Sequence, residues 1–295
     1  MKRPILFLVF NRPDVTQRVF EAIKEQKPVK LYIAADGPRL NRVGEERLCE
    51  ETRRIVSAVD WPCEVKTLYR NENLGCKVAV SSAIDWFFEH EEQGIILEDD
   101  CLPNATFFTF CSTLLDKYKD DERIMHIGGC NVLEKVESGD TYSFIRYPLI
   151  WGWATWRRSW KFYDETMSDY PIKEKEGFLR KAFPSIRIRS HWKYMFDRAF
   201  NKKIDTWDYQ WTYAILSRNN ISIIPNQNMV VNIGFSDLAT HTSKEDDRTL
   251  LKSYLISDIV HPKQVNVNDN LEKVIESKYY SFSFGKRLML KLLKK

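Results

Sequence analysis

The sequence predicts an α/β protein with a central, mostly parallel sheet flanked by helices. Two observations carry this prediction. First, apolar runs of strand length alternate with segments of helical periodicity, three times before a fourth strand, which is the order of a doubly wound sheet. Second, the fourth run, Gly94–Leu97, has no polar side chain and leads directly into Glu98-Asp99-Asp100. A run of this kind is typical of a central strand covered on both faces.

The first strand and helix follow from the residues at the N-terminus. Pro4–Phe10 is a buried strand by composition, and Asn11-Arg12-Pro13 ends it. Asp14 is predicted to cap the helix that follows, with Gln17 three residues later completing a capping-box pattern.

The next strands and helices repeat this arrangement. Leu31–Ala35 is a second strand that ends in the turn Asp36-Gly37-Pro38. A helix of about 43–59 follows, then a third strand over 64–69 that ends in Arg70–Gly75, and a helix over 76–90.

The acids that follow Leu97 define the expected site. Unpaired buried charge is very costly, so Glu98, Asp99 and Asp100 must meet solvent, a cation or a ligand. Ligands of open α/β sheets bind beyond the carboxyl ends of the strands, and carboxylates there suit a divalent cation that also holds a diphosphate. The alternative is an acidic loop in which Asp100 only favours the dipole of the helix after Pro103.

Each of the four strand exits carries polar residues. Any one of these groups alone is more typical of turn chemistry than of function. If the strands are parallel, however, all four lie at one edge of the sheet and together predict a nucleotide-binding cradle. The sequence has no Gly-x-Gly-x-x-Gly and no Walker motif. The expected cradle residues are Asn11, Arg12, Asp36, Arg70, Asn73, Glu98 and Asp99.

The second half of the chain is rich in aromatic residues. A helix over 106–118 and strands over 124–127 and 143–147 precede the motif Trp151-Gly152-Trp153. These tryptophans are either core residues or an aromatic wall against a sugar, and the pattern alone does not choose between them.

The segment Trp207-Asp208 places one acid among aromatic side chains. A carboxylate in such surroundings can have the raised pKa of a general base. The alternative is that Asp208 is the N-cap of the helix continuing over 211–218. Short strands over 221–224 and 229–231 follow, and then His241, either a structural histidine or a metal or diphosphate ligand.

Composition excludes several classes of protein. The 295 residues carry 45 basic and 41 acidic side chains, a net charge of +4, which argues against a nucleic-acid binder with a dominant basic face. The six cysteines have no zinc spacing, and reduced thiols in a cytoplasmic protein are expected. Neither a secretory signal nor an apolar stretch of membrane-spanning length is evident.

In order and content, these motifs resemble the GT-A glycosyltransferases, whose nucleotide-sugar-binding domain is Rossmann-like. The pattern is most similar to bacterial family-2-like transferases and to the animal N-acetylglucosaminyltransferases that start complex N-glycans. The resemblance spans about 5–241, and Glu98-Asp99-Asp100 matches the glutamate-aspartate-aspartate form of the family's DxD motif.

The resemblance implies a role for each matched residue. Asn11, Arg12, Asp36 and Arg70 would hold the nucleotide, while Glu98 and Asp99 would hold ribose or sugar. Asp100, and in some enzymes a late histidine such as His241, would ligate Mn²⁺ or Mg²⁺. Asp208 matches the catalytic base of an inverting enzyme, although the animal enzymes carry two adjacent acids where this chain has Asp208-Tyr209. Four residues are expected to contact substrate: Trp151, Gly152, Trp153 and Trp207.

The expected function is therefore metal-dependent, inverting transfer of a sugar from a nucleotide-diphosphate sugar, with UDP-sugars the first expectation, to a glycan or lipid-linked acceptor. The alternatives are a sugar-1-phosphate nucleotidylyltransferase and a non-catalytic nucleotide- or glycan-binding protein. A single catalytic domain over 1–260 is expected, with a nucleotide-sugar half (1–131) and an acceptor half (132–260).

The C-terminal extension, 261–295, ends in a basic amphipathic tail. Five basic residues and no acid follow Gly285, and leucines can share one side of a helix. The tail either attaches a cytoplasmic enzyme peripherally to the inner face of a membrane or packs its leucines on the catalytic domain.

Overall fold

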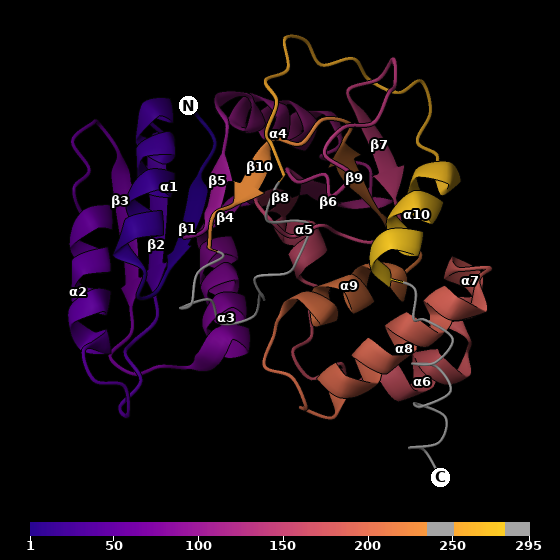
Figure 1. Ribbon diagram of the computed structural model, residues 1–295, viewed down its shortest axis with the longest axis horizontal. Coiled ribbons are helices and arrows are strands. Elements are labelled where there is room, and N and C mark those ends of the chain that lie inside the picture. Colours follow the sequence, from indigo (N-terminus) through magenta and orange to yellow (C-terminus); the bar gives the residue numbers. More distant parts are fainter. Residues whose placement is uncertain (235–250, 281–295) are drawn as a thin grey trace.

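The fold is an α/β sandwich built on one long sheet (Figure 1). The structure is a computed structural model, and it describes residues 1–234 and 251–280. The strands are β1 (Ile5–Val9), β2 (Lys30–Ala35), β3 (Glu64–Tyr69), β4 (Gln93–Glu98), β5 (Cys101–Pro103), β6 (Ile124–Gly128), β7 (Tyr142–Ile145), β8 (Trp153–Trp156), β9 (Ile221–Pro225) and β10 (Val230–Asn232). The α-helices are α1 (Pro13–Gln26), α2 (Glu45–Val56), α3 (Gly75–His90), α4 (Ala105–Lys117), α5 (Arg157–Trp160), α6 (Tyr170–Lys175), α7 (Phe178–Ala182), α8 (Ile186–Phe200), α9 (Asp208–Leu216) and α10 (Asp269–Ile275), and α10 is followed by a π-helix, η2 (Glu276–Tyr280).

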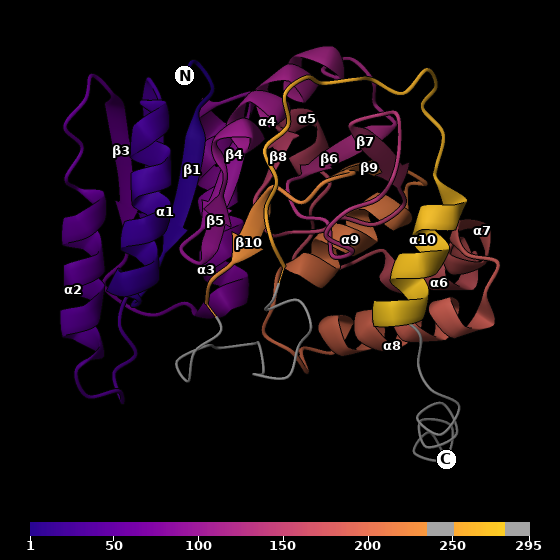
Figure 2. The same cartoon turned by 45° about the horizontal axis from the view of Figure 1, so that its top comes forward.

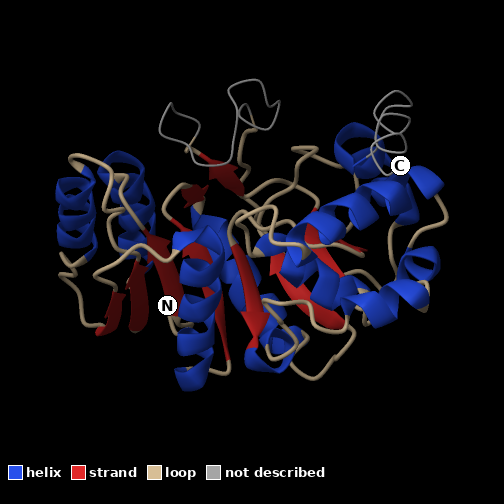
Figure 3. Cartoon of the chain, turned by 90° about the horizontal axis from the view of Figure 1, so that it is seen from below, coloured by secondary structure: helices blue, strands red, loops and turns tan. Residues whose placement is uncertain are grey.

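Within the described residues the main sheet has eight strands in the order β3-β2-β1-β4-β8-β6-β9-β7. The first four pair in parallel, which confirms the predicted doubly wound half. β8 runs antiparallel between β4 and β6, and joins the two halves of the chain into one sheet. Figure 3 shows the strands crossing the middle of the molecule among the helices.

Alternating side chains of the strands pack against different helices. On β1, Ile5 and Phe7 share a cluster with α1, α2 and α4, whereas Leu6 and Leu8 share another with α3, α5 and α9. This is the alternation expected when both faces of a strand are buried. The carboxyl ends of β1, β2, β3 and β4 therefore meet at one edge, as predicted.

The start of α1 differs from the prediction. Pro13, not a residue after Asp14, is the first helical residue, and Arg12 holds the N-cap position without a side-chain capping bond. Asp14 lies inside the first turn, and the Gln17 amide donates to Glu21 at 2.9 Å. Proline suits the first helical position because it has no N–H to satisfy there.

A smaller sheet of β5 and β10 lies where the two halves meet, and both strands are side by side in Figures 1 and 2. The sequence pattern did not predict β5, β8, α5, α6, α7 or α10. The C-terminal α10 packs Leu271 and Ile275 into the second half, and its Glu272 accepts bonds from the backbone N–H and guanidinium of Arg146.

No helix in the described ranges reaches the length and hydropathy that crossing a bilayer requires. The predicted amphipathic tail lies outside the described residues.

His126 on β6 provides a test of this core. The side chain is fully buried, Nε2 lies 3.1 Å from the Leu149 carbonyl oxygen, and the Trp211 indole N–H donates to Nδ1 at 3.3 Å. Nε2 therefore carries the proton in the neutral ring, and a second proton would remove the acceptor that Trp211 uses. Burial lowers the pKa of His126 to about 3.

We expect His126 to destabilise the fold as the pH falls. In the unfolded chain the imidazole binds a proton near pH 6.5, so from there down to about pH 3 the unfolded state binds more protons. By pH 5 this linkage lowers the free energy of unfolding by about 2 kcal/mol. Urea denaturation at pH 7.5 and pH 5 should show the loss in wild type and in the exposed control His90→Gln. The loss of the free energy of unfolding should be smaller in His126→Gln. An equal loss in wild type, His90→Gln and His126→Gln would show that His126 is not its source.

Candidate active site

A cavity of about 430 Å³ opens at the carboxyl edge of the sheet. Its walls come from the exits of β1, β2 and β4, from the start of α3, and from the segment 205–208 that leads into α9. This volume lies in the range of small-molecule sites. Eleven of the sequence-predicted site residues line it: Asn11, Arg12, Asp36, Arg70, Asn73, Glu98, Asp99, Asp100, Trp151, Trp207 and Asp208.

Arg12 bonds to two of the three acids in Glu98–Asp100, which we call the acidic motif. Its Nη2 donates to a carboxylate oxygen of Asp99 and, at 2.9 Å, to Oδ2 of Asp100. Burial acts to lower the pKa of Arg12, but the two carboxylates outweigh it and raise that pKa further. Burial of Glu98, together with repulsion from Asp100, raises the pKa of Glu98.

The carboxylates outnumber the cations in this cavity. Six carboxylates and three guanidinium groups line it among the described residues. The acids are Asp36, Glu98, Asp99, Asp100, Asp205 and Asp208. A diphosphate would enter this cavity against net repulsion unless a cation accompanied it.

The donor set fits a hard cation that shares oxygens with a diphosphate. Within residues 1–234 and 251–280, no group of three or more His, Cys, Asp or Glu is arranged to hold a metal by itself. Mg²⁺-type sites commonly use one or two carboxylates plus substrate phosphates, and Asp100 and Glu98 can provide these. His241 lies outside the described residues.

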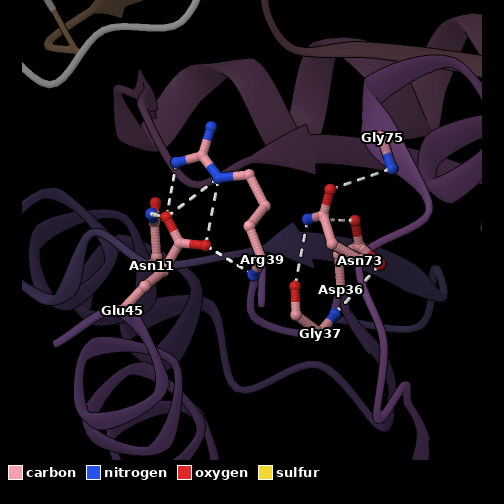
Figure 4. A network of polar contacts seen from close by, with 7 residues as sticks. All are labelled: Asn11, Asp36, Gly37, Arg39, Glu45, Asn73 and Gly75. Carbon is pink, nitrogen blue, oxygen red and sulfur yellow. Dashed lines mark hydrogen bonds and ion pairs between the residues drawn. The ribbon is translucent and has the colours of Figure 1, made fainter. Parts of the chain in front are cut away.

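The exit of β2 is joined to the loop before α3 by the Asp36 carboxylate. It accepts a bond from the Asn73 amide at 2.9 Å (Figure 4). It also accepts one from the backbone N–H of Leu74 at 3.1 Å. Burial raises the pKa of Asp36, and the backbone N–H groups of Leu74 and Gly37 act against that rise. Gly37 permits the close approach, because a Cβ there would lie 2.5 Å from the Glu72 backbone. Asp36 and Asn73 thus shape the cavity wall as well as line it.

A second network, not predicted from sequence, supports Asn11. Its amide donates to buried Glu45 at 2.9 Å, and Glu45 also accepts from the backbone N–H of Arg39 at 2.6 Å and from the Arg39 guanidinium (Figure 4). Burial acts to raise the pKa of Glu45, but the bonds from Arg39 and Asn11 lower it overall. Acids in a first helical turn are common, so the pattern offered no signal for Glu45.

Arg70 also lines the cavity, and its guanidinium donates to the Ser82 hydroxyl at 2.7 Å. That contact leaves Arg70 anchored to α3 at the cavity wall.

Asp208 is the first residue of α9, and Trp207, not Asp208, holds the N-cap position. The N-cap alternative for Asp208 is therefore wrong. The Thr206 hydroxyl donates to Asp208 Oδ1, and the Asp208 charge contributes to the raised pKa of Glu98. The carboxylate thus lies within electrostatic range of the acidic motif.

The tryptophans divide between cavity and core. Trp151 is half-buried and lines the cavity. Trp153 is 1% exposed and stacks between His126 and Trp207, at ring distances of 5.1 and 5.4 Å. Trp207 is 2% exposed yet borders the cavity. Gly152 adopts φ +60°, and a Cβ there would lie 2.9 Å from Val230. Neither Trp153 nor Gly152 lines the cavity.

Comparison with known proteins yields distant similarities only. No protein-family model and no curated protein matches the sequence. Among solved structures, UDP-glucose pyrophosphorylase complexed with UDP-glucose is similar over 78% of this chain and 92% of its own, with 11% identity and a TM-score of 0.40. S. aureus TarS 1-349 is similar over 79% and 61%, with 9% identity and a TM-score of 0.41. HddC from Yersinia pseudotuberculosis is similar over 57% and 80%, with 11% identity and a TM-score of 0.33. Similarity at this level assigns no activity to the chain.

Proposed function

We propose that this protein is a metal-dependent, inverting glycosyltransferase that uses a nucleoside-diphosphate sugar. The observation that carries the proposal is that a single cavity brings Asp208 together with Arg12 and the acidic motif Glu98–Asp100. Inverting transfer needs a base for the acceptor hydroxyl and positive charge for the departing diphosphate. The excess of carboxylates in the cavity supports the need for an added cation.

The described side chains divide the chemistry between them. Asp100, with Glu98 beside it, would hold Mn²⁺ or Mg²⁺, which when bound neutralises charge on the diphosphate. Arg12 would add a fixed positive charge next to that group. The nucleotide would lie toward Asn11, Asp36, Arg70 and Asn73, at the exits of β1, β2 and β3.

Asp208 would act on the acceptor. Its carboxylate would take the proton of the acceptor hydroxyl while that oxygen attacks the anomeric carbon, and the nucleoside diphosphate would leave from the opposite face of the sugar. The bond to the new oxygen forms as the bond to the diphosphate breaks, so the anomeric configuration inverts. Trp151 at the cavity wall would pack against a sugar ring.

The charge distribution favours this function over sugar-1-phosphate nucleotidylyl transfer. A nucleotidylyltransferase binds a triphosphate and a sugar phosphate, which together bring more negative charge into the site. Its phosphate nucleophile is already ionised and needs no base such as Asp208. A cavity with six carboxylates and three guanidinium groups suits that reaction poorly.

A donor screen tests the proposal. The full-length protein is incubated with UDP-, GDP- and dTDP-sugars, with Mn²⁺, Mg²⁺ or EDTA, and release of nucleoside diphosphate is measured. In parallel, nucleoside triphosphates and sugar 1-phosphates are supplied and pyrophosphate is measured. We expect metal-dependent release from one donor class and no pyrophosphate. Pyrophosphate formation without donor turnover would assign the nucleotidylyltransferase instead, and no binding of any nucleotide would exclude both.

A further inference from the structure

The start of α3 is capped by a residue from the other half of the chain. The backbone N–H groups of Cys76 and Lys77 donate to the two carboxylate oxygens of Asp205, at 3.1 and 3.2 Å. The residue at the N-cap position of α3, Leu74, makes no side-chain capping bond. Asp205, 129 residues from Cys76, thus satisfies two of the amides that a helix start leaves unpaired.

Gly75 is shaped to this contact. It adopts φ +78°, and a Cβ at this position would lie 2.7 Å from Oδ2 of Asp205. Any side chain at residue 75 would therefore push the carboxylate away from the amides. The contact therefore depends on the missing side chain of Gly75 as well as on the carboxylate of Asp205.

Asp205 also belongs to the segment that carries Asp208. Trp207 buries its ring against Trp153 in the core, and the Thr206 hydroxyl donates to the Asp208 carboxylate. These two contacts attach Asp208 to the second half, and Trp207 also belongs to the apolar cluster that includes Ala83 and Ile84 of α3. Asp205 adds a contact to α3, in the first half.

The residues at the start of α3 also bond to the loop before the helix and to the exit of β2. The Gly75 N–H donates to Asn73 at 3.2 Å, and the Leu74 N–H donates to Asp36 at 3.1 Å. A continuous set of hydrogen bonds therefore runs from the exit of β2, through the loop before α3, to the residues before Asp208.

We propose that Asp205 is a positioning residue that sets the placement of Asp208 relative to the bound donor. This inference rests on the proposed function. Misplacement of a catalytic group by about 1 Å can lower turnover by about 10²-fold. Loss of the Asp205 bridge removes the hydrogen bonds that join the segment 205–208 to the start of α3, while Asp36 keeps its own bonds to Asn73 and Leu74.

The test compares three variants at Asp205 and Gly75 with a control on the same loop. We expect Asp205→Ala to lower kcat by about 10- to 100-fold without weakening nucleotide affinity. Asp205→Asn should lose less of kcat than Asp205→Ala, because its single amide oxygen can still accept from one of the two backbone N–H groups. Gly75→Ala should reproduce the loss, and combining it with Asp205→Ala should add little, because both remove one contact. Lys203→Ala, an exposed change two residues away, should behave as wild type.

The outcomes separate this inference from the proposed function. If the wild type is active and Asp205→Ala has the same kcat, the positioning role is overturned. An equal loss of kcat in Asp205→Ala and Asp205→Asn would also overturn it. Wild type without turnover on any donor would overturn the proposed function. In that case hydrogen exchange still decides on the bridge: the Cys76 and Lys77 amides should exchange faster in Asp205→Ala, and unchanged protection would overturn the contact itself.

Discussion

Asp208→Asn is expected to lower kcat by at least about 10²-fold while leaving nucleotide binding intact. The amide keeps the size of the side chain and can still accept the bond from Thr206. It cannot take the proton of an acceptor hydroxyl, so the loss falls on the chemical step. Initial rates with the donor identified by screening give kcat, and calorimetry with the nucleoside diphosphate gives affinity.

A matched control separates the loss of a general base from the loss of a negative charge in the first turn of a helix. Asp14 lies in the first turn of α1, just as Asp208 lies in the first turn of α9. Asp14 is exposed and is not among the residues that line the cavity. Asp14→Asn should therefore retain wild-type kcat. Wild-type turnover in Asp208→Asn would remove Asp208 from the role of base. NMR of the first-formed product provides an independent check, because retention of the anomeric configuration is incompatible with a single displacement.

Asp100→Ala should abolish divalent-cation-dependent nucleotide binding and, with it, turnover. The side chain is 16% exposed, and its backbone carbonyl still accepts the Ile233 N–H at 2.8 Å. Arg12 retains its bond to Asp99 in the variant. We therefore expect the fold to persist while the cavity loses its ligand for the cation.

Calorimetric titration with UDP and GDP, with and without Mn²⁺, measures this effect directly. In wild type the affinity should rise with Mn²⁺, and in Asp100→Ala the titrations with and without Mn²⁺ should coincide. Asp60→Ala, which removes a surface carboxylate paired with Lys24, is the control for charge and should keep the Mn²⁺ effect. Mn²⁺-dependent affinity that survives in Asp100→Ala would contradict the metal assignment, provided that thermal melting shows a folded protein.

Much of the first half was predictable because its signals are local. A strand buried on both faces must be apolar throughout, and a helix over it must repeat with helical periodicity, so Gly94–Leu97 and the segments before it were identified from composition. Parallel strands bring their carboxyl ends to one edge. For this reason Asn11, Asp36 and Asp100, far apart in sequence, were expected together, and they line one cavity.

Features that depend on contacts between distant segments, in either half, were less predictable. β8 is a strand because β4 and β6 pair with it, and its tryptophans gave no signal that chose between core and an aromatic wall. The start of α1 was placed too late because Pro13 initiates the helix in place of a side-chain cap. Glu45 and Arg39 form a network whose members carry no distinctive spacing.

The sequence by itself therefore determined the α/β class, the parallel direction of the first four strands and the edge at which polar side chains gather. These follow from periodicity and from the geometry of parallel strands, which act over a few residues or apply to every such sheet. Only the tertiary structure decided that Trp151 lines the cavity while Trp153 is core, that Arg12 joins Asp99 to Asp100, and that Asp205 caps α3. Each of these depends on contacts between segments distant in sequence, and such contacts form only when the whole chain is packed.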